Sequence, residues 1–239
     1  MNTILYPAKE RGHVNFGWLD SWHSFSFGQF YDPKKIHFGA LRVVNDDSVA
    51  GGGGFGAHPH DNMEIVTIPL EGKLAHKDST GNEGIIRKGD VQIMSAGTGI
   101  RHSEYNASAT EIAKFLQIWV FPKLKNIKPE YGQKTFDLDG RRNKWQVVVS
   151  PEVSEEGLNI NQDARFSLAD LEAGKTIRYE MKWKNSGLYL FVIDGAVKTG
   201  DQSLSKRDAL GISDTDQVII EAVGNAQVLA IEVPLTFAD

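Results

Sequence analysis

The chain has 239 residues, 41% hydrophobic and 24% charged, with a formal net charge of −5. This length suffices for one large domain or two small ones. The scattered lysines and arginines argue against nucleic-acid binding, which needs a clustered basic surface. The absence of cysteine excludes disulfides and thiolate metal sites. Since there is no apolar N-terminal stretch and no run near the ~20 apolar residues that span a bilayer, we expect a cytoplasmic protein without membrane segments.

The first half of the sequence reads as short strands separated by turn residues. Residues 38–45 form a predicted strand, which the polar run 45–47 is expected to close as a turn. The four glycines at 51–54 are expected to form a turn into the next strand. Further predicted strands cover 63–70, 73–78, 84–87, 91–94, 101–106 and 115–121. Strands at spacings of about 8–12 residues, with little helical periodicity, predict an all-β sandwich or barrel.

Residues 122–140 interrupt this pattern with prolines, lysines and no clear alternation, so they are predicted to connect two domains. A weak internal repeat supports two domains, because the turns at 70–74 and 87–90 resemble those at 193–197 and 205–208. We therefore predict two tandem β domains, at 1–135 and 136–239. Predicted strands of the second half cover 145–149, 177–183, 188–193, 196–199, 209–212, 217–221 and 226–233, whereas 164–171 fits no class clearly.

Two pairs of metal-binding side chains stand out: His58 and His60, separated by one proline, and His102 and Glu104, separated by one serine. Residues i and i+2 of a β-strand point to the same face. Two such pairs on neighbouring strands bring three imidazoles and one carboxylate together, a set that suits a first-row transition metal. All seven histidines lie at or before His102, so the second half cannot rebuild this site.

The remaining histidines lack this paired spacing. His13 and His23 are interpreted as structural, His37 as a surface residue beside two lysines, and His76 as a residue without a ligand pattern.

The sequence resembles the cupin superfamily, and more specifically the pirin family. Residues 52–72, GGGFGAHPHDNMEIVTIPLEG, are similar to the first cupin motif, and residues 89–106, GDVQIMSAGTGIRHSEYN, to the second. The second motif departs from the usual form by Ser95-Ala-Gly97 and by two extra residues before its histidine. These departures, together with RGHVNFGWLDSWHSFSF at 11–27, are typical of pirins. The resemblance is specific over about residues 10–120 and diffuse beyond them.

The resemblance implies a bicupin, with two tandem jelly-roll-like β-barrels of which only the N-terminal one binds metal. The positions that match the pirin ligands are His58, His60, His102 and Glu104. In many other cupins the fourth ligand is the glutamate of the first motif, which matches Glu64 here. Both the pirin pattern and the shared strand face of His102 and Glu104 favour Glu104. Glu64 is then expected to lie behind the ligands.

For function, the resemblance implies a metal-dependent dioxygenase that opens flavonol-type, quercetin-like substrates with O2, with Glu104 as the base. The implied cofactor is one divalent transition metal, Fe(II) in first place, with Zn, Mn, Co, Ni and Cu as alternatives. The implied partners are a small aromatic substrate and O2. A second hypothesis follows from animal pirins: a redox-sensing regulatory protein that uses its metal to act on a protein partner. A cupin isomerase or non-redox binder ranks third.

Overall fold

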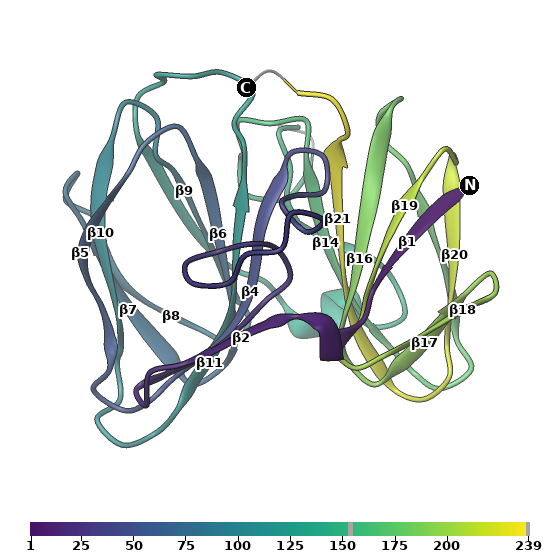
Figure 1. The fold of residues 1–239 in the computed structure, drawn as a ribbon, viewed down its shortest axis with the longest axis horizontal. Helices are drawn as coiled ribbons and strands as arrows, with labels where there is room; N and C mark the ends of the chain where they lie inside the picture. The colour runs from purple at the N-terminus through teal and green to yellow at the C-terminus, as the bar shows by residue number, and fades with distance from the viewer. Residues whose placement is uncertain (153–154, 238–239) are drawn as a thin grey trace.

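The computed structural model describes residues 1–152 and 155–237, and over these ranges the chain forms 21 β-strands. They make two β-barrels side by side, with the N-terminal half on the left of Figure 1 and the C-terminal half on the right. The predicted all-β, two-barrel architecture is confirmed. Two short 3-10 helices, η1 (Ala8–Glu10) and η2 (Leu138–Arg141), complete the regular structure of this part of the chain. Among the described residues, no helix has the length and apolar character that a membrane crossing requires.

The N-terminal barrel consists of a large and a small antiparallel sheet. The large sheet has the order β12 (Glu130–Thr135), β9 (Asp90–Ser95), β6 (Glu64–Glu71), β11 (Ala113–Val120), β4 (Leu41–Val49), β3 (Leu19–His23) and β2 (Gly12–Asn15). The small sheet has the order β5 (Gly54–His60), β10 (Ile100–Asn106), β7 (Lys73–Asp78) and β8 (Glu83–Arg87).

The C-terminal barrel is built in the same way. Its large sheet has the order β1 (Asn2–Tyr6), β19 (Ala209–Ser213), β16 (Ser186–Asp194), β21 (Ala226–Pro234), β14 (Arg165–Leu171) and β13 (Gln146–Val149). Its small sheet has the order β15 (Thr176–Glu180), β20 (Gln217–Ala222), β17 (Ala196–Thr199) and β18 (Gln202–Ser205).

The strand orders of the two barrels correspond one to one from β4 to β11 and from β14 to β21. The weak repeat in the sequence reflects this correspondence. Gly72 ends the β6–β7 turn with φ 72°, and Gly195 ends the β16–β17 turn with φ 79°. Glycine adopts this left-handed conformation without the steric cost that a Cβ atom adds. The same turn chemistry therefore recurs at the same place in each barrel.

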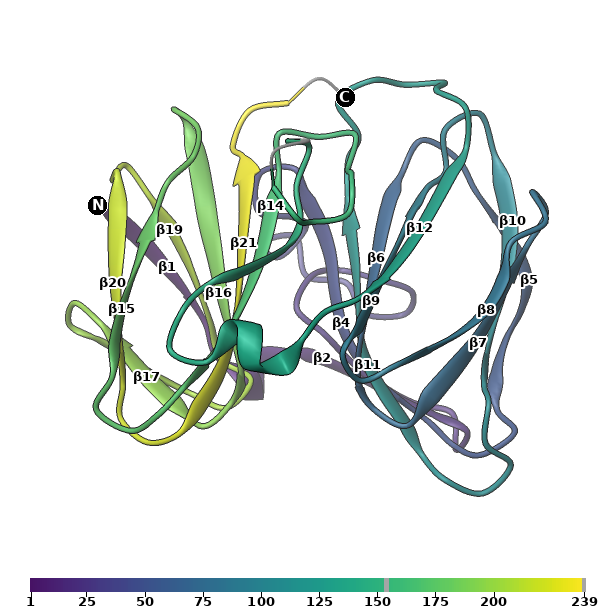
Figure 2. The same ribbon diagram turned by 180° about the vertical axis from the view of Figure 1, so that it is seen from behind.

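Two segments depart from the predicted organisation. β1 pairs with β19 over the whole of Asn2–Tyr6, so these residues hydrogen-bond in the C-terminal sheet, although the proposed division groups them with the N-terminal half. The region 122–140 was predicted as a connection, but β12 within it pairs with β9 as the edge strand of the N-terminal sheet. Figure 2 shows β12 beside β9, and η2 after it between the barrels. The alternation of apolar and polar residues is weak in β12 because most of its residues are exposed. Its sequence therefore resembles that of a loop.

The outer faces of the two large sheets pack against each other and form one core between the barrels. This core includes Val44 and Ile118 of the N-terminal sheet and Tyr189 and Ile231 of the C-terminal sheet, all essentially inaccessible. A sheet that is buried on both faces can carry polar groups on one face where they are hydrogen-bonded or where that face lines a cavity. The inner face of β4 is such a case.

Candidate metal centre

The two predicted ligand pairs lie on adjacent strands of the small N-terminal sheet. β10 pairs antiparallel with β5, and His102 lies opposite His58, while Ile100 lies opposite His60. The ring nitrogens of His58, His60 and His102 that could bind a metal all lie within 4.8 Å of one another. The one-residue spacing of the histidine pair therefore brings three imidazoles to one point, as the strand geometry requires.

The hydrogen bonding and the protonation of the three imidazoles fit the binding of a metal ion. Both ring nitrogens of His102 are buried and lack a hydrogen-bond partner among the described residues. The ring of His58 is oriented through Nδ1, which lies 2.8 Å from the carbonyl oxygen of Gly56 and leaves Nε2 for a ligand role. Burial lowers the pKa of His102 to about 3 and that of His60 to about 4. Both rings are therefore neutral at physiological pH, which is the form that binds metals.

Glu104 shares the inner face of β10 with His102, and 2% of it is exposed. Gln117 Nε2 donates to Glu104 Oε2 at 2.8 Å, and Thr67 Oγ1 lies 3.4 Å from Oε1. Burial, and then the nearby charge of Asp47, raise the pKa of Glu104 to about 7. A divalent cation would offset this cost of burying the carboxylate, so the donor set fits a metal.

His76 is a residue of this centre that the sequence reasoning missed. Its ring, together with His102 and Glu104, forms a second group whose ligand atoms lie within 4.8 Å of one another. The two groups overlap at His102. The nitrogens of His76 also have protein partners, since Nδ1 lies 3.0 Å from Gln92 Nε2 and Nε2 lies 3.5 Å from Asp78. The only signal for it in the sequence is Asp78, two residues further along the same strand.

Glu64, the alternative fourth ligand, belongs to neither group among the described residues. Its carboxylate accepts a hydrogen bond from Ser95 Oγ at 2.7 Å and one from the backbone N–H of Asn161 at 3.1 Å. Glu64 therefore connects β6 to the segment between β13 and β14 of the C-terminal barrel and does not support the imidazoles.

A cavity of about 300 Å³ opens beside these side chains. Its walls are mainly apolar, and Phe55, Phe27 and Trp119 contribute aromatic rings. Such a volume and lining are typical of small-molecule sites. The candidate ligands that reach it are His58, His60 and Glu104.

The structure corrects the predicted turn at residues 45–47. β4 continues through them to Val49, and Asn45 and Asp47 point into the cavity. His23, predicted as structural, also lines the cavity, and His37 is exposed as predicted. In the sequence, a polar residue in a cavity wall cannot be distinguished from a polar residue in a turn. This is why residues 45–47 were predicted as a turn.

The strand registers identify what stands at the ligand positions of the C-terminal barrel. Gly72 and Gly195 are equivalent, and so are the residues two positions later: Leu74, which pairs with Asn106, and Val197, which pairs with Ala222. Four residues before Asn106 on β10 is His102, and four residues before Ala222 on β20 is Val218. Val218 pairs with Tyr179, as His102 pairs with His58. The positions of His58, His60, His102 and Glu104 thus correspond to Tyr179, Met181, Val218 and Ile220, none of which is a histidine or a carboxylate.

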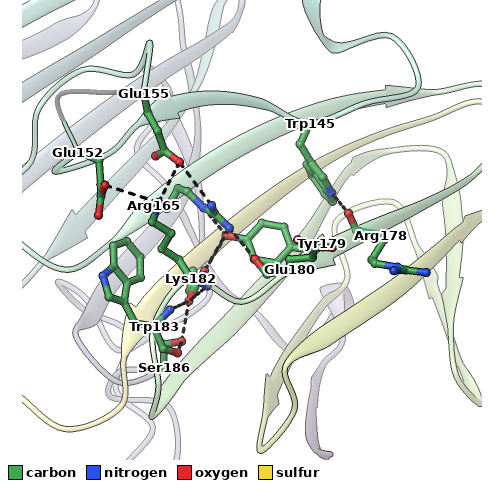
Figure 3. Close-up of polar contacts among 11 residues, drawn as sticks. Trp145, Glu152, Glu155, Arg165, Arg178, Tyr179, Glu180, Lys182, Trp183 and Ser186 are labelled. Carbon is green, nitrogen blue, oxygen red and sulfur yellow. Dashed lines mark hydrogen bonds and ion pairs between the residues drawn. The ribbon is translucent and has the colours of Figure 1, made fainter.

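Tyr179 belongs instead to a hydrogen-bonded network, shown in Figure 3 with Arg165 and Ser186. The network surrounds Glu232, whose side chain is fully buried. Its carboxylate accepts hydrogen bonds from Ser186 Oγ at 2.6 Å, from Tyr179 Oη at 3.0 Å and from the backbone N–H groups of residues 182 and 183. Arg165 lies 3.5 Å from the same carboxylate. These contacts satisfy the buried charge from within the protein.

Two β-barrels in tandem, one with a histidine and carboxylate centre and one with neither histidine nor carboxylate at the corresponding positions, define a bicupin whose N-terminal barrel can hold a divalent metal. Comparison with known proteins gives the family. The family model described as Pirin matches residues 7–120, and the model described as Quercetinase C-terminal cupin domain matches residues 147–233. The chain belongs to the pirin family.

Individual relatives match over nearly the whole chain. Quercetin 2,3-dioxygenase of Escherichia coli (strain K12) is 43% identical over 235 residues, which cover 96% of this chain and 98% of that protein. A pirin-like protein of Caulobacter vibrioides is 40% identical, over 95% of this chain and 97% of that protein. The crystal structure of the bacterial pirin YhhW from E. coli in complex with nickel(II) has a TM-score of 0.93 and 40% identity, and covers 98% of this chain and all of that one.

Proposed function

We propose that this protein is a metal-dependent dioxygenase that opens flavonol-type, quercetin-like substrates with O2. The observation that carries the proposal is the mainly apolar, aromatic-lined cavity of about 300 Å³, which three of the four candidate ligands reach. A flat aromatic substrate fits such walls. The relatedness to E. coli quercetin 2,3-dioxygenase supports the same substrate class.

In this proposal His58, His60, His102 and Glu104 hold one divalent metal, with Fe(II) as the first candidate and Ni, Mn, Co, Cu and Zn as alternatives. The bound ion supplies Lewis acidity and orients the reactants. The apolar walls exclude water from the bound substrate. Glu104 is the proposed acceptor of the proton from a substrate hydroxyl. Gln117 holds its carboxylate in place, and Thr67 orients the amide of Gln117.

The test combines metal analysis with oxygen uptake. Natively expressed protein is purified without oxygen, its metal content is measured, and the metal-free protein is reconstituted with each candidate ion. Oxygen uptake with flavonols is expected for at least one ion, and Glu104→Gln is expected to lose it. If no ion supports uptake, the dioxygenase proposal is wrong, and a regulatory role through a protein partner becomes the better hypothesis.

A further inference from the structure

A second buried carboxylate, that of Asp47, faces the same cavity as the candidate ligands. Asp47 lies on β4 two residues after Asn45, and both side chains line the cavity wall. Only 4% of Asp47 is exposed. Among the described residues, it belongs to neither group that could hold a metal. Its carboxylate is therefore available for another role.

Ser21 and His23 on the neighbouring strand β3 hold this carboxylate from one side. The hydroxyl of Ser21 donates to Asp47 Oδ1, and Ser21 Oγ lies 2.7 Å from His23 Nε2. All three side chains are buried and line the cavity. Asp47 Oδ2 accepts no hydrogen bond from the described protein atoms, which leaves it for a ligand in the cavity.

The charges around Asp47 make it a suitable base. Burial raises the pKa of Asp47 to about 7, although the hydrogen bond from Ser21 lowers it. The charge of Asp46 raises this pKa further, and the charge of Arg11 lowers it. Burial lowers the pKa of His23 to about 4, so its ring is neutral and adds no positive charge. A general base works best when its pKa lies near the operating pH.

We propose that Asp47 is a second carboxylate base of this cavity, which accepts the proton of a second phenolic hydroxyl of the bound substrate, while Glu104 accepts the proton of the hydroxyl beside the metal. This inference rests on the proposed function. The substrate O–H bond breaks, a new O–H bond forms at Asp47 Oδ2, and the electron pair remains on the phenolate oxygen, so nothing is oxidised. A carboxylate held by a cation is a weaker base than one that is not, so Asp47 is the better placed base for a hydroxyl that does not bind the metal. Ser21 and His23 are positioning residues.

The test compares Asp47→Asn with the control Asp20→Asn in the metal-reconstituted protein. Asparagine keeps the shape of Asp47 but cannot accept the proton. Asp20 lies on β3 next to Ser21, and its carboxylate is partly exposed against His13, so its replacement removes a nearby charge outside the cavity. Three quantities are measured: metal content, kcat and KM for flavonol opening, and the absorption spectrum of a flavonol bound without oxygen, which reports ionisation of its hydroxyls.

Asp47→Asn is expected to keep its metal and nearly the same KM, to lose roughly 10²–10⁴-fold in kcat, and to bind the flavonol with one hydroxyl fewer ionised than in the wild type. Asp20→Asn should resemble the wild type. Ser21→Ala, which keeps the base but removes its donor, should lower kcat less than Asp47→Asn does. The inference is overturned if Asp47→Asn turns over at the wild-type rate with the flavonol ionised as in the wild type, or if it loses the metal. A wild-type protein that neither binds nor opens flavonols contradicts the proposed function itself.

Discussion

Gln117 and Glu104 are joined by a hydrogen bond of 2.8 Å that crosses the interior of the N-terminal barrel from the large sheet to the small one. Thr67 Oγ1 donates in turn to Gln117 Oε1 at 2.8 Å. The amide is thus oriented by the hydroxyl, and the carboxylate by the amide. These hydrogen bonds orient the Glu104 carboxylate from within the barrel.

We expect Gln117→Leu to weaken metal binding by about 10–100-fold, the effect typical of removing a partner that orients a ligand. The matched control is Gln217→Leu, on the exposed side of β20, which should bind metal as the wild type does. Competition with a chelator of known affinity measures the metal affinity of both variants. Equal affinities in the two variants would show that Gln117 does not position Glu104.

The raised pKa of Glu104 predicts a pH effect on the stability of the metal-free protein. The folded protein holds a proton on Glu104 up to about pH 7, whereas the unfolded chain releases it near the ordinary glutamate pKa of about 4.3. The contribution of Glu104 to stability is therefore fully present below about pH 4 and is lost as the pH rises through 7. Glu104→Gln removes this dependence.

The comparison is made by denaturant unfolding in the presence of a chelator. The metal-free Glu104→Gln variant should gain stability over the wild type between pH 5 and pH 8. The depressed pKa values of His60 and His102 act in the opposite direction in both proteins, so they cancel in the difference. A difference that is independent of pH would contradict the raised pKa.

Tyr179→Phe is expected to destabilise the protein by about 1–3 kcal/mol, because it removes one donor from the buried carboxylate of Glu232 and leaves an imperfectly satisfied charge. Urea unfolding measures this loss. Tyr31→Phe serves as the control, since Tyr31 is 75% exposed and its hydroxyl should contribute little. Metal binding should stay unchanged in Tyr179→Phe, since the network lies in the other barrel.

Deletion of residues 1–6 should destabilise the C-terminal barrel in particular. The deletion uncovers the edge of β19, which pairs with β1 over five residues, and removes Tyr6, which packs against Tyr189 in the core between the barrels. Hydrogen exchange should accelerate at the amides of β19 that face β1 and change little in β9. Similar acceleration in both strands would indicate a global effect instead.

The all-β fold could be predicted from the local spacing of strands and turns, and the two tandem barrels from the weak repeat and the family resemblance. Two residues on one strand face, such as His102 and Glu104, need no knowledge of the tertiary structure. The position of β1 could not be predicted, since its partner β19 lies about two hundred residues away. Asp47 was misread as part of a turn, because only the cavity explains a polar side chain at an inward position. His76 was missed because its proximity to His102 arises from the pairing of β7 with β10.

The proposed dioxygenase activity is tested most directly by the fate of the oxygen atoms. Metal-reconstituted protein is supplied with a flavonol and ¹⁸O2, and the ring-opened products are analysed by mass spectrometry, with His102→Ala as the control that lacks a central ligand. We predict that the wild type places both atoms of O2 in the products and that His102→Ala forms no labelled product. Unlabelled products, or equal labelling by His102→Ala, would contradict a metal-dependent dioxygenase.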